Sequence, residues 1–216
     1  MNVNREQSPQ NIAPLATGLM GAVAGAVGVW LMDRADWFMW NREDGAARAK
    51  TVAVRPGGEA PAGVLASRVE KHVGARPTDR QHDVAEVAIH YVIGVGPAAI
   101  YSLTRDKLPV SGAARGLLYG LGLFLIQDEA LNAASGLSAK PQRYPWQPHA
   151  RGLVAHLVYG LTTEVSLNLM QKALGGSNGR SITENGRQAT ADIAVVKARE
   201  LGAGHGRNPR DGRRQS

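Results

Sequence analysis

The sequence predicts an all-α integral membrane protein, a four-helix bundle of membrane-spanning helices with a disordered C-terminal tail. Residues 12–32 carry no charge, and a helix of that length at about 1.5 Å per residue extends roughly 31 Å, the thickness of a bilayer's hydrocarbon core. Three weaker apolar stretches follow, at 84–104, 113–134 and 151–174. The mean hydropathy is slightly negative because the charged residues are concentrated outside these stretches. The alternative is a soluble protein, but core helices are rarely apolar on every face over about five turns.

Composition narrows the classes of site and partner. The chain of 216 residues contains no cysteine, which excludes disulfides, thiolate metal sites and thiol nucleophiles. Its formal charge of +7 suits basic segments that lie beside anionic lipid headgroups. An Arg-rich tail could also contact nucleic acid, but no nucleic-acid-binding motif accompanies the charge. We therefore expect the lipid bilayer, and not nucleic acid, to be the partner of this chain.

The first predicted span, residues 12–32, follows a polar N-terminus of residues 1–11. Its glycines are spaced to allow a second helix to approach closely. The aromatic cluster 37–40 follows the span and is typical of the headgroup level of a membrane. The apolar run is longer than that of a signal peptide, and aromatic residues occupy the place of a cleavage site, so we expect a retained anchor.

A polar connection, residues 41–83, separates the first span from the second. Its middle, 55–61, contains two prolines and two glycines and is expected to be a loop. The pattern at 62–74 is amphipathic, with valines and a leucine on one face and charged residues on the other. This pattern fits a helix lying in the membrane interface and equally fits an ordinary soluble helix.

The other three spans differ in how apolar they are. In the second span, 84–104, Pro97 is expected to kink the helix. The third span, 113–134, contains Gln127, Asp128 and Glu129 in its second half and has the weakest apolar signal. A proline-containing loop leads to the fourth span, 151–174. The remainder, 175–216, is basic and predicted to be mostly disordered, with at most a short helical patch near 193–201.

A short motif occurs twice along the predicted spans. The first and third spans each contain two glycines four residues apart, followed eight residues later by an aspartate, and the second and fourth each contain a histidine followed by a glycine four residues on. The alternative is chance alignment of glycine-rich helices, but agreement at four motif positions favours a duplicated helical hairpin, with a pseudo-twofold axis along the membrane normal. The glycines expected to pack helices together are Gly21, Gly25, Gly94, Gly116, Gly120 and Gly160.

Three segments resemble a known family. They are 90–94, 119–121 together with the Asp128-Glu129 pair, and 156–161. On these segments the chain is similar to the YagU-like family of uncharacterised bacterial inner-membrane proteins, over about residues 12–172. The resemblance implies a multi-helix inner-membrane protein and supplies no established reaction or site. The polar connection and the basic tail depart from the family pattern.

Ionisable residues cluster at one depth of the predicted bundle. Following the chain through its crossings places six of them in one layer near one membrane face, while Glu164 lies about 12 Å further along the fourth helix, nearest the midplane. Ionisable groups inside a bilayer are costly and usually face a partner or water. The six residues of this polar layer are Asp33, Glu86, His90, Asp128, Glu129 and His156.

The polar layer has four interpretations. Asp128 could pair with His156, and Asp33 or Glu86 with His90, to fix the helix register. The same carboxylates and imidazoles could move protons or cations, or ligate a divalent metal. The histidines His90 and His156 could also hold a haem iron between them, although neither has a diagnostic flanking motif. Pairing of the carboxylates with Arg34 or Arg151 would favour the structural interpretation.

No catalytic motif is present, and no bound cofactor is expected. We therefore expect a non-enzymatic, multi-pass protein of the bacterial inner membrane, either structural or binding a partner, which could be a second copy or another membrane protein packed on its glycine-rich helix faces. The alternative is a small proton- or ion-handling protein that uses the polar layer. Lysines and arginines divide almost evenly between the two sides of the membrane, and the basic tail favours cytoplasmic termini.

Overall fold

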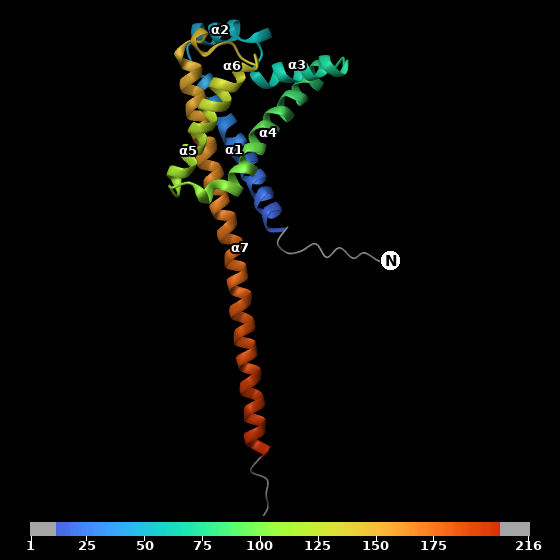
Figure 1. Cartoon of the computed structure of the whole chain (residues 1–216), viewed down its shortest axis with the longest axis vertical. Coiled ribbons are helices and arrows are strands. Elements are labelled where there is room, and N and C mark those ends of the chain that lie inside the picture. The colour runs from blue at the N-terminus through green and yellow to red at the C-terminus, as the bar shows by residue number, and fades with distance from the viewer. Residues whose placement is uncertain (1–11, 204–216) are drawn as a thin grey trace, which may run out of the picture. The chain divides into compact units, whose positions relative to one another are not determined.

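The computed structural model describes the backbone of residues 12–203 and the side chains of residues 14–174. Every regular element in this range is a helix, which confirms the all-α class (Figure 1). The chain forms two compact units, residues 1–170 and 171–216, and each is described by itself. The first unit contains every predicted span except the last few residues of the fourth.

Helices α1 (Ile12–Trp40) and α4 (Asp79–Thr104) form the first hairpin. Their backbones approach closely because small residues face each other, and a Cβ atom added to Gly25 would lie 2.5 Å from the Cβ of Ala98. Helix α1 extends eight residues beyond the predicted span, through the aromatic cluster. Thr78 and Gln81 form a reciprocal capping box at the start of α4, which therefore begins five residues before the predicted span.

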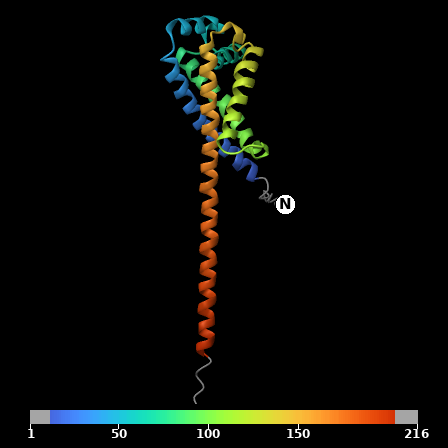
Figure 2. The same cartoon turned by 90° about the vertical axis from the view of Figure 1, so that its left-hand side faces the viewer.

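The second hairpin pairs the helix over residues 113–134 with the first part of α7 (Trp146–Ala203). The helix consists of α5 (Ala113–Leu123), the π-helical stretch η4 (Phe124–Leu131) and one final turn, α6 (Asn132–Ala134). A Cβ atom added to Gly116 would lie 2.7 Å from the carbonyl oxygen of Gly160, so these two backbones also touch (Figure 2).

All six predicted packing glycines contact helices of the same chain. Their partners in the other helix of each hairpin include Val29, Ala98 and His156, and an added Cβ atom would clash with each. These six glycines therefore pack helices of one chain against each other. Docking of a partner on the glycine-rich helix faces stays a prediction. Gly18 and Gly122, by contrast, have nothing within 4 Å of an added Cβ atom.

The polar connection folds at one end of the hairpins (Figure 1). It contains α2 (Gly45–Val54), the short turn η2 (Pro56–Gly58) and α3 (Pro61–Val73), the last within one residue of the predicted amphipathic helix. Arg68 of α3 donates hydrogen bonds of 2.8 and 2.6 Å to the carbonyl oxygens of Ser135 and Gly136, just after α6. The turn η5 (Pro141–Arg143) lies in the loop that leads to α7.

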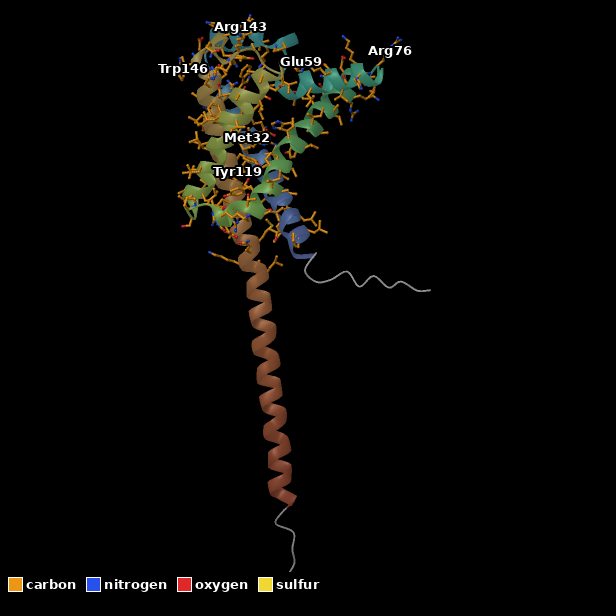
Figure 3. The ribbon with its side chains drawn as sticks, in the orientation of Figure 1. Met32, Glu59, Arg76, Tyr119, Arg143 and Trp146 are labelled. Atoms are coloured by element: carbon orange, nitrogen blue, oxygen red, sulfur yellow. The ribbon has the colours of Figure 1, made fainter. Side chains whose placement is uncertain are left out.

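Three tyrosines join the hairpins in the interior. The rings of Tyr101 and Tyr119 stack with centroids 4.0 Å apart, and the hydroxyl groups of Tyr119 and Tyr159 lie 3.1 Å apart. Tyr159 also donates a 2.6 Å hydrogen bond to the carbonyl oxygen of Gly94. Figure 3 places Tyr119 among the helices, away from the end at which Glu59, Arg143 and Trp146 lie. The tyrosines thus tie α4, α5 and α7 together.

The prediction of a mostly disordered tail is wrong for residues 175–203, where α7 continues as a helix. No proline occurs between Pro148 and Pro209, so nothing in the sequence forces the helix to end. Alanine is frequent between residues 189 and 203 and favours helix. The last part of the predicted tail, 204–216, and the N-terminus, 1–11, lie outside the described residues.

Two helices of the described chain are long and apolar enough to cross a membrane, at Pro14–Trp40 and Asp79–Lys107. Only 28% of the most apolar window of the first and 11% of the second is buried within the chain. A core helix of a soluble protein would be mostly buried. The predicted third and fourth spans are helical but are not among these two.

Candidate functional site

A cavity of about 430 Å³ lies where the hairpins meet the polar connection. Its walls come from α1, α4, η4 and α7, together with the segment that joins α2 to α3 and the loop before α7. Met32, labelled in Figure 3, is one of the apolar residues that line it. The structure brings together in this cavity the six residues of the predicted polar layer: Asp33, Glu86, His90, Asp128, Glu129 and His156.

One of the predicted pairs is present. Nε2 of His90 lies 2.8 Å from Oδ1 of Asp33, so α1 and α4 are joined by an ion pair or hydrogen bond at the cavity wall. About a third of each side chain is exposed. The sequence left open whether Asp33 or Glu86 would be the partner, and the geometry selects Asp33.

The second predicted pair, Asp128 with His156, is not formed. Nδ1 of His156 instead donates a 2.8 Å hydrogen bond to the carbonyl oxygen of Gly152, and Asp128 accepts a 3.2 Å bond from Asn132. The reason lies in η4, because a π-helical turn holds more residues than an α-helical one and shifts the direction of the side chains that follow. Asp128 consequently faces Gly152, where an added Cβ atom would lie 2.9 Å from Oδ2 of Asp128.

Glu129 has a partner that sequence reasoning missed. Its Oε1 lies 2.6 Å from Nδ1 of His149, in the first turns of α7. Nε2 of the same ring lies 3.1 Å from the carbonyl oxygen of Pro141, which can only accept. Both ring nitrogens of His149 therefore face oxygen atoms, which fixes the orientation of the ring. His149 follows Pro148 in a stretch that was predicted to be a loop but forms the first turn of α7, and no periodicity in the sequence marks it.

Arg151 contacts two carboxylates and an aromatic ring at the cavity wall. Its Nε donates a 2.7 Å bond to Oδ1 of Asp36, its Nη1 contacts Glu43, and its guanidinium carbon lies 4.7 Å from the ring centroid of Trp40. The sequence named Arg151 as a possible carboxylate partner but did not identify Asp36 or Glu43. Arg34, named with it, instead lies 5.0 Å over the ring of Trp30.

Glu164 is not part of the cavity. It is fully buried, and its Oε2 accepts bonds of 2.7 Å from the hydroxyl of Tyr101 and 2.9 Å from Arg105. Its Oε1 accepts a 3.1 Å bond from Nε of Arg115 and a 3.2 Å bond from Asn168. With two guanidinium groups against one carboxylate, this cluster holds Glu164 as an anion and is suited to structure.

Besides Asp128, two further cavity residues have no ion-pair partner of their own among the described residues. Glu86 and Arg55 both line the cavity and are half-buried, and neither makes a hydrogen bond or ion pair with another side chain that the structure describes. Burial lowers the pKa of Arg55, and the nearby charge of Arg151 lowers it further. Sequence reasoning missed Arg55 because it follows α2 in a region that was expected to be a loop.

The donor geometry bears on the metal and haem interpretations. Within residues 14–174, no three histidine, aspartate or glutamate side chains come together as a metal ligand set. For a haem between His90 and His156, the pair with Asp33 leaves Nδ1 of His90 as its ligating atom, and the bond to Gly152 leaves Nε2 of His156. The arrangement suits ionic and hydrogen-bonding chemistry better than metal ligation.

The chain matches no known protein family, no curated protein and no solved structure. The similarity to the YagU-like family that the sequence segments carry therefore stays a prediction.

Proposed function

We propose that this chain is a multi-pass protein of the bacterial inner membrane, with four spans and both termini in the cytoplasm. The proposal is supported by the exposed apolar side chains of α1 and α4. Large apolar side chains are also exposed on the other two predicted spans, among them Leu118, Ile126, Val165 and Leu169. Such a surface is stable against lipid and unfavourable against water.

Alkaline carbonate extraction tests this localisation. An integral protein stays in the membrane pellet, because carbonate removes proteins held by charge and leaves those held by hydrocarbon contact. Release of the intact chain into the supernatant without detergent would contradict the membrane proposal and the intramembrane site that depends on it.

Within the membrane, we propose that the cavity binds and passes protons or small cations. The observation that carries this proposal is the charge of the lining, since carboxylates outnumber guanidinium groups by five to two. Glu86 and Asp128 have no cationic partner within ion-pair distance, so they are free to accept a proton or a cation. The five carboxylates are Asp33, Asp36, Glu86, Asp128 and Glu129, and the two guanidinium groups are those of Arg55 and Arg151.

The purified chain in vesicles that contain a pH-sensitive dye provides the test. We expect the wild-type protein to dissipate an imposed pH gradient, and we expect Asp128→Asn or Glu86→Gln to reduce the rate to that of protein-free vesicles. Asp83→Asn is the matched control, because Asp83 is an exposed carboxylate one turn before Glu86 on the same helix and does not line the cavity.

The rival function is a non-enzymatic structural or partner-binding role. It is favoured by the closed pairs that link the helices, such as Asp33 with His90 and Asp36 with Arg151. Absence of flux in the wild-type protein, together with lower melting temperatures for the Asp128 and Glu86 variants, would support the rival and contradict the proton or cation function.

A further inference from the structure

Most of the carboxylates around the cavity already have a partner within the chain. Asp33 lies 2.8 Å from His90, Glu129 lies 2.6 Å from His149, and Asp36 accepts a 2.7 Å bond from Arg151. Because these carboxylates are already paired, they are less available to bind a ligand. Three charged groups of the lining have no ion-pair partner among the described residues, and we call them the open charges. They are the carboxylates of Glu86 and Asp128 and the guanidinium of Arg55.

Arg55 is unusual because its half-buried guanidinium has no ion-pair partner among the described residues. It lies at the end of α2, lines the cavity and also lines an adjoining hollow between Trp37 and Trp40. Its guanidinium carbon lies 5.8 Å from the ring centroid of Trp40. Asp36 and Glu86 act on it electrostatically, but neither forms an ion pair or hydrogen bond with it in the described part of the chain. A half-buried guanidinium with five N–H donors and no hydrogen-bonded anion is incompletely solvated, so an anionic group of a ligand would stabilise it.

The open carboxylates lie on other walls of the same cavity. Glu86 is on α4 and lies against α3, where an added Cβ atom on Gly63 would be 3.2 Å from Oε2 of Glu86. Asp128 is on η4 and is bonded only to Asn132. His156, which is almost fully buried, adds an Nε2 atom that has no hydrogen-bond partner among the described residues. An ammonium group, with three donors, fits such a set of acceptors.

From this juxtaposition we infer that the cavity takes a small zwitterion, with its ammonium group between Glu86 and Asp128 and its phosphate or carboxylate group on Arg55. This inference rests on the proposed cation site and specifies the cation. A simple cation would leave Arg55 open and repelled, and a simple anion would meet an excess of carboxylates. The volume of about 430 Å³ is in the range of small-molecule sites.

A zwitterionic ligand of this kind could come from two sources in a membrane. A free solute could enter from water, or the headgroup of an ethanolamine phospholipid could enter through the hollow beside Trp37 and Trp40. Both present one ammonium and one anionic phosphate. Phosphoethanolamine represents this shared chemistry, and its two halves, ethanolamine and inorganic phosphate, are matched controls.

Binding of these three probes to the full chain, reconstituted in phosphatidylglycerol vesicles, tests the inference. We expect phosphoethanolamine to bind at least about ten-fold more tightly than ethanolamine or phosphate, because a charge-assisted bond to Arg55 is added. Arg55→Gln is expected to remove this preference, and Arg55→Lys to restore part of it. Arg48→Gln should keep the preference, since Arg48 lies at a similar distance, 5.9 Å, from the ring of Trp40 but does not line the cavity.

The outcomes separate this inference from the proposed function. Equal binding of ethanolamine and phosphoethanolamine, unchanged by Arg55→Gln and Arg55→Lys, would overturn the zwitterion and leave the cation site standing. Failure of every probe to bind, with no proton flux, would overturn both. Adding phosphatidylethanolamine to the vesicles distinguishes the sources, because a headgroup ligand competes with phosphoethanolamine and a free solute leaves its affinity unchanged.

Discussion

At the scale of single residues, the chain keeps its buried charges by pairing them within the fold. Glu164 and Arg105 are both almost fully buried, and Arg115 completes the cluster from α5. Removing a charge from such a cluster costs more than the pair contributes, because the remaining groups stay in an apolar interior without compensation. The cavity residues differ, since open charges there have space beside them for a ligand.

We predict that Glu164→Gln lowers the free energy of unfolding by about 3 kcal/mol, because Arg105 and Arg115 would be left with no buried counter-charge. Denaturant unfolding in detergent measures the change. Asp106→Asn is the control, since Asp106 also contacts Arg115 but its side chain is 78% exposed, and such exposed pairs contribute about 1 kcal/mol or less. Equal losses in the two variants would contradict a structural role for the buried cluster.

At the scale of the elements, helix packing was the part of the fold most accessible from sequence. Four apolar stretches predicted four helices, and the glycine spacing predicted the faces on which they touch. The π-helical η4 could not be predicted, because no residue type in Phe124–Leu131 distinguishes a π-helical from an α-helical turn. Without it, the direction of Asp128 and the missing bond to His156 could not be anticipated. The continuation of α7 past residue 174 was not predicted, because the composition of the tail favours disorder, although no proline interrupts the chain before Pro209.

Two glycines of the same helix provide a test of the packing. An added Cβ atom on Gly120 would clash with the backbone of His156, while one on Gly122 would meet nothing within 4 Å. We predict that Gly120→Ala separates α5 from α7 and lowers the melting temperature. Gly122→Ala should raise it slightly, because alanine favours helix over glycine by up to about 1 kcal/mol. Thermal unfolding in detergent measures both, and a harmless Gly120→Ala would show that the hairpin does not depend on this contact.

At the scale of the whole molecule, the polar layer could be predicted because it depends only on chain direction. Alternate helices reverse direction, so the end of one span and the start of the next must lie at the same depth. This reasoning brought together six residues that now line one cavity. It could not supply Arg55 or His149, because neither residue lies in a predicted span. The two halves share their glycine packing and differ in their Asp–His pairs, since Asp33 pairs with His90 and Asp128 does not pair with His156.

The number of spans is the property on which the membrane proposal can be tested most directly. The chain has no cysteine, so single substitutions Gly58→Cys, Lys107→Cys and Lys140→Cys each provide one exposed thiol for a membrane-impermeant maleimide. Four spans place residues 58 and 140 on one side and residue 107 on the other. If only α1 and α4 cross, the stretches 113–134 and 151–174 do not, and residue 140 is then labelled from the same side as residue 107. With cytoplasmic termini, we predict that intact cells label the variants at 58 and 140, and that the variant at 107 reacts only after the membrane is permeabilised.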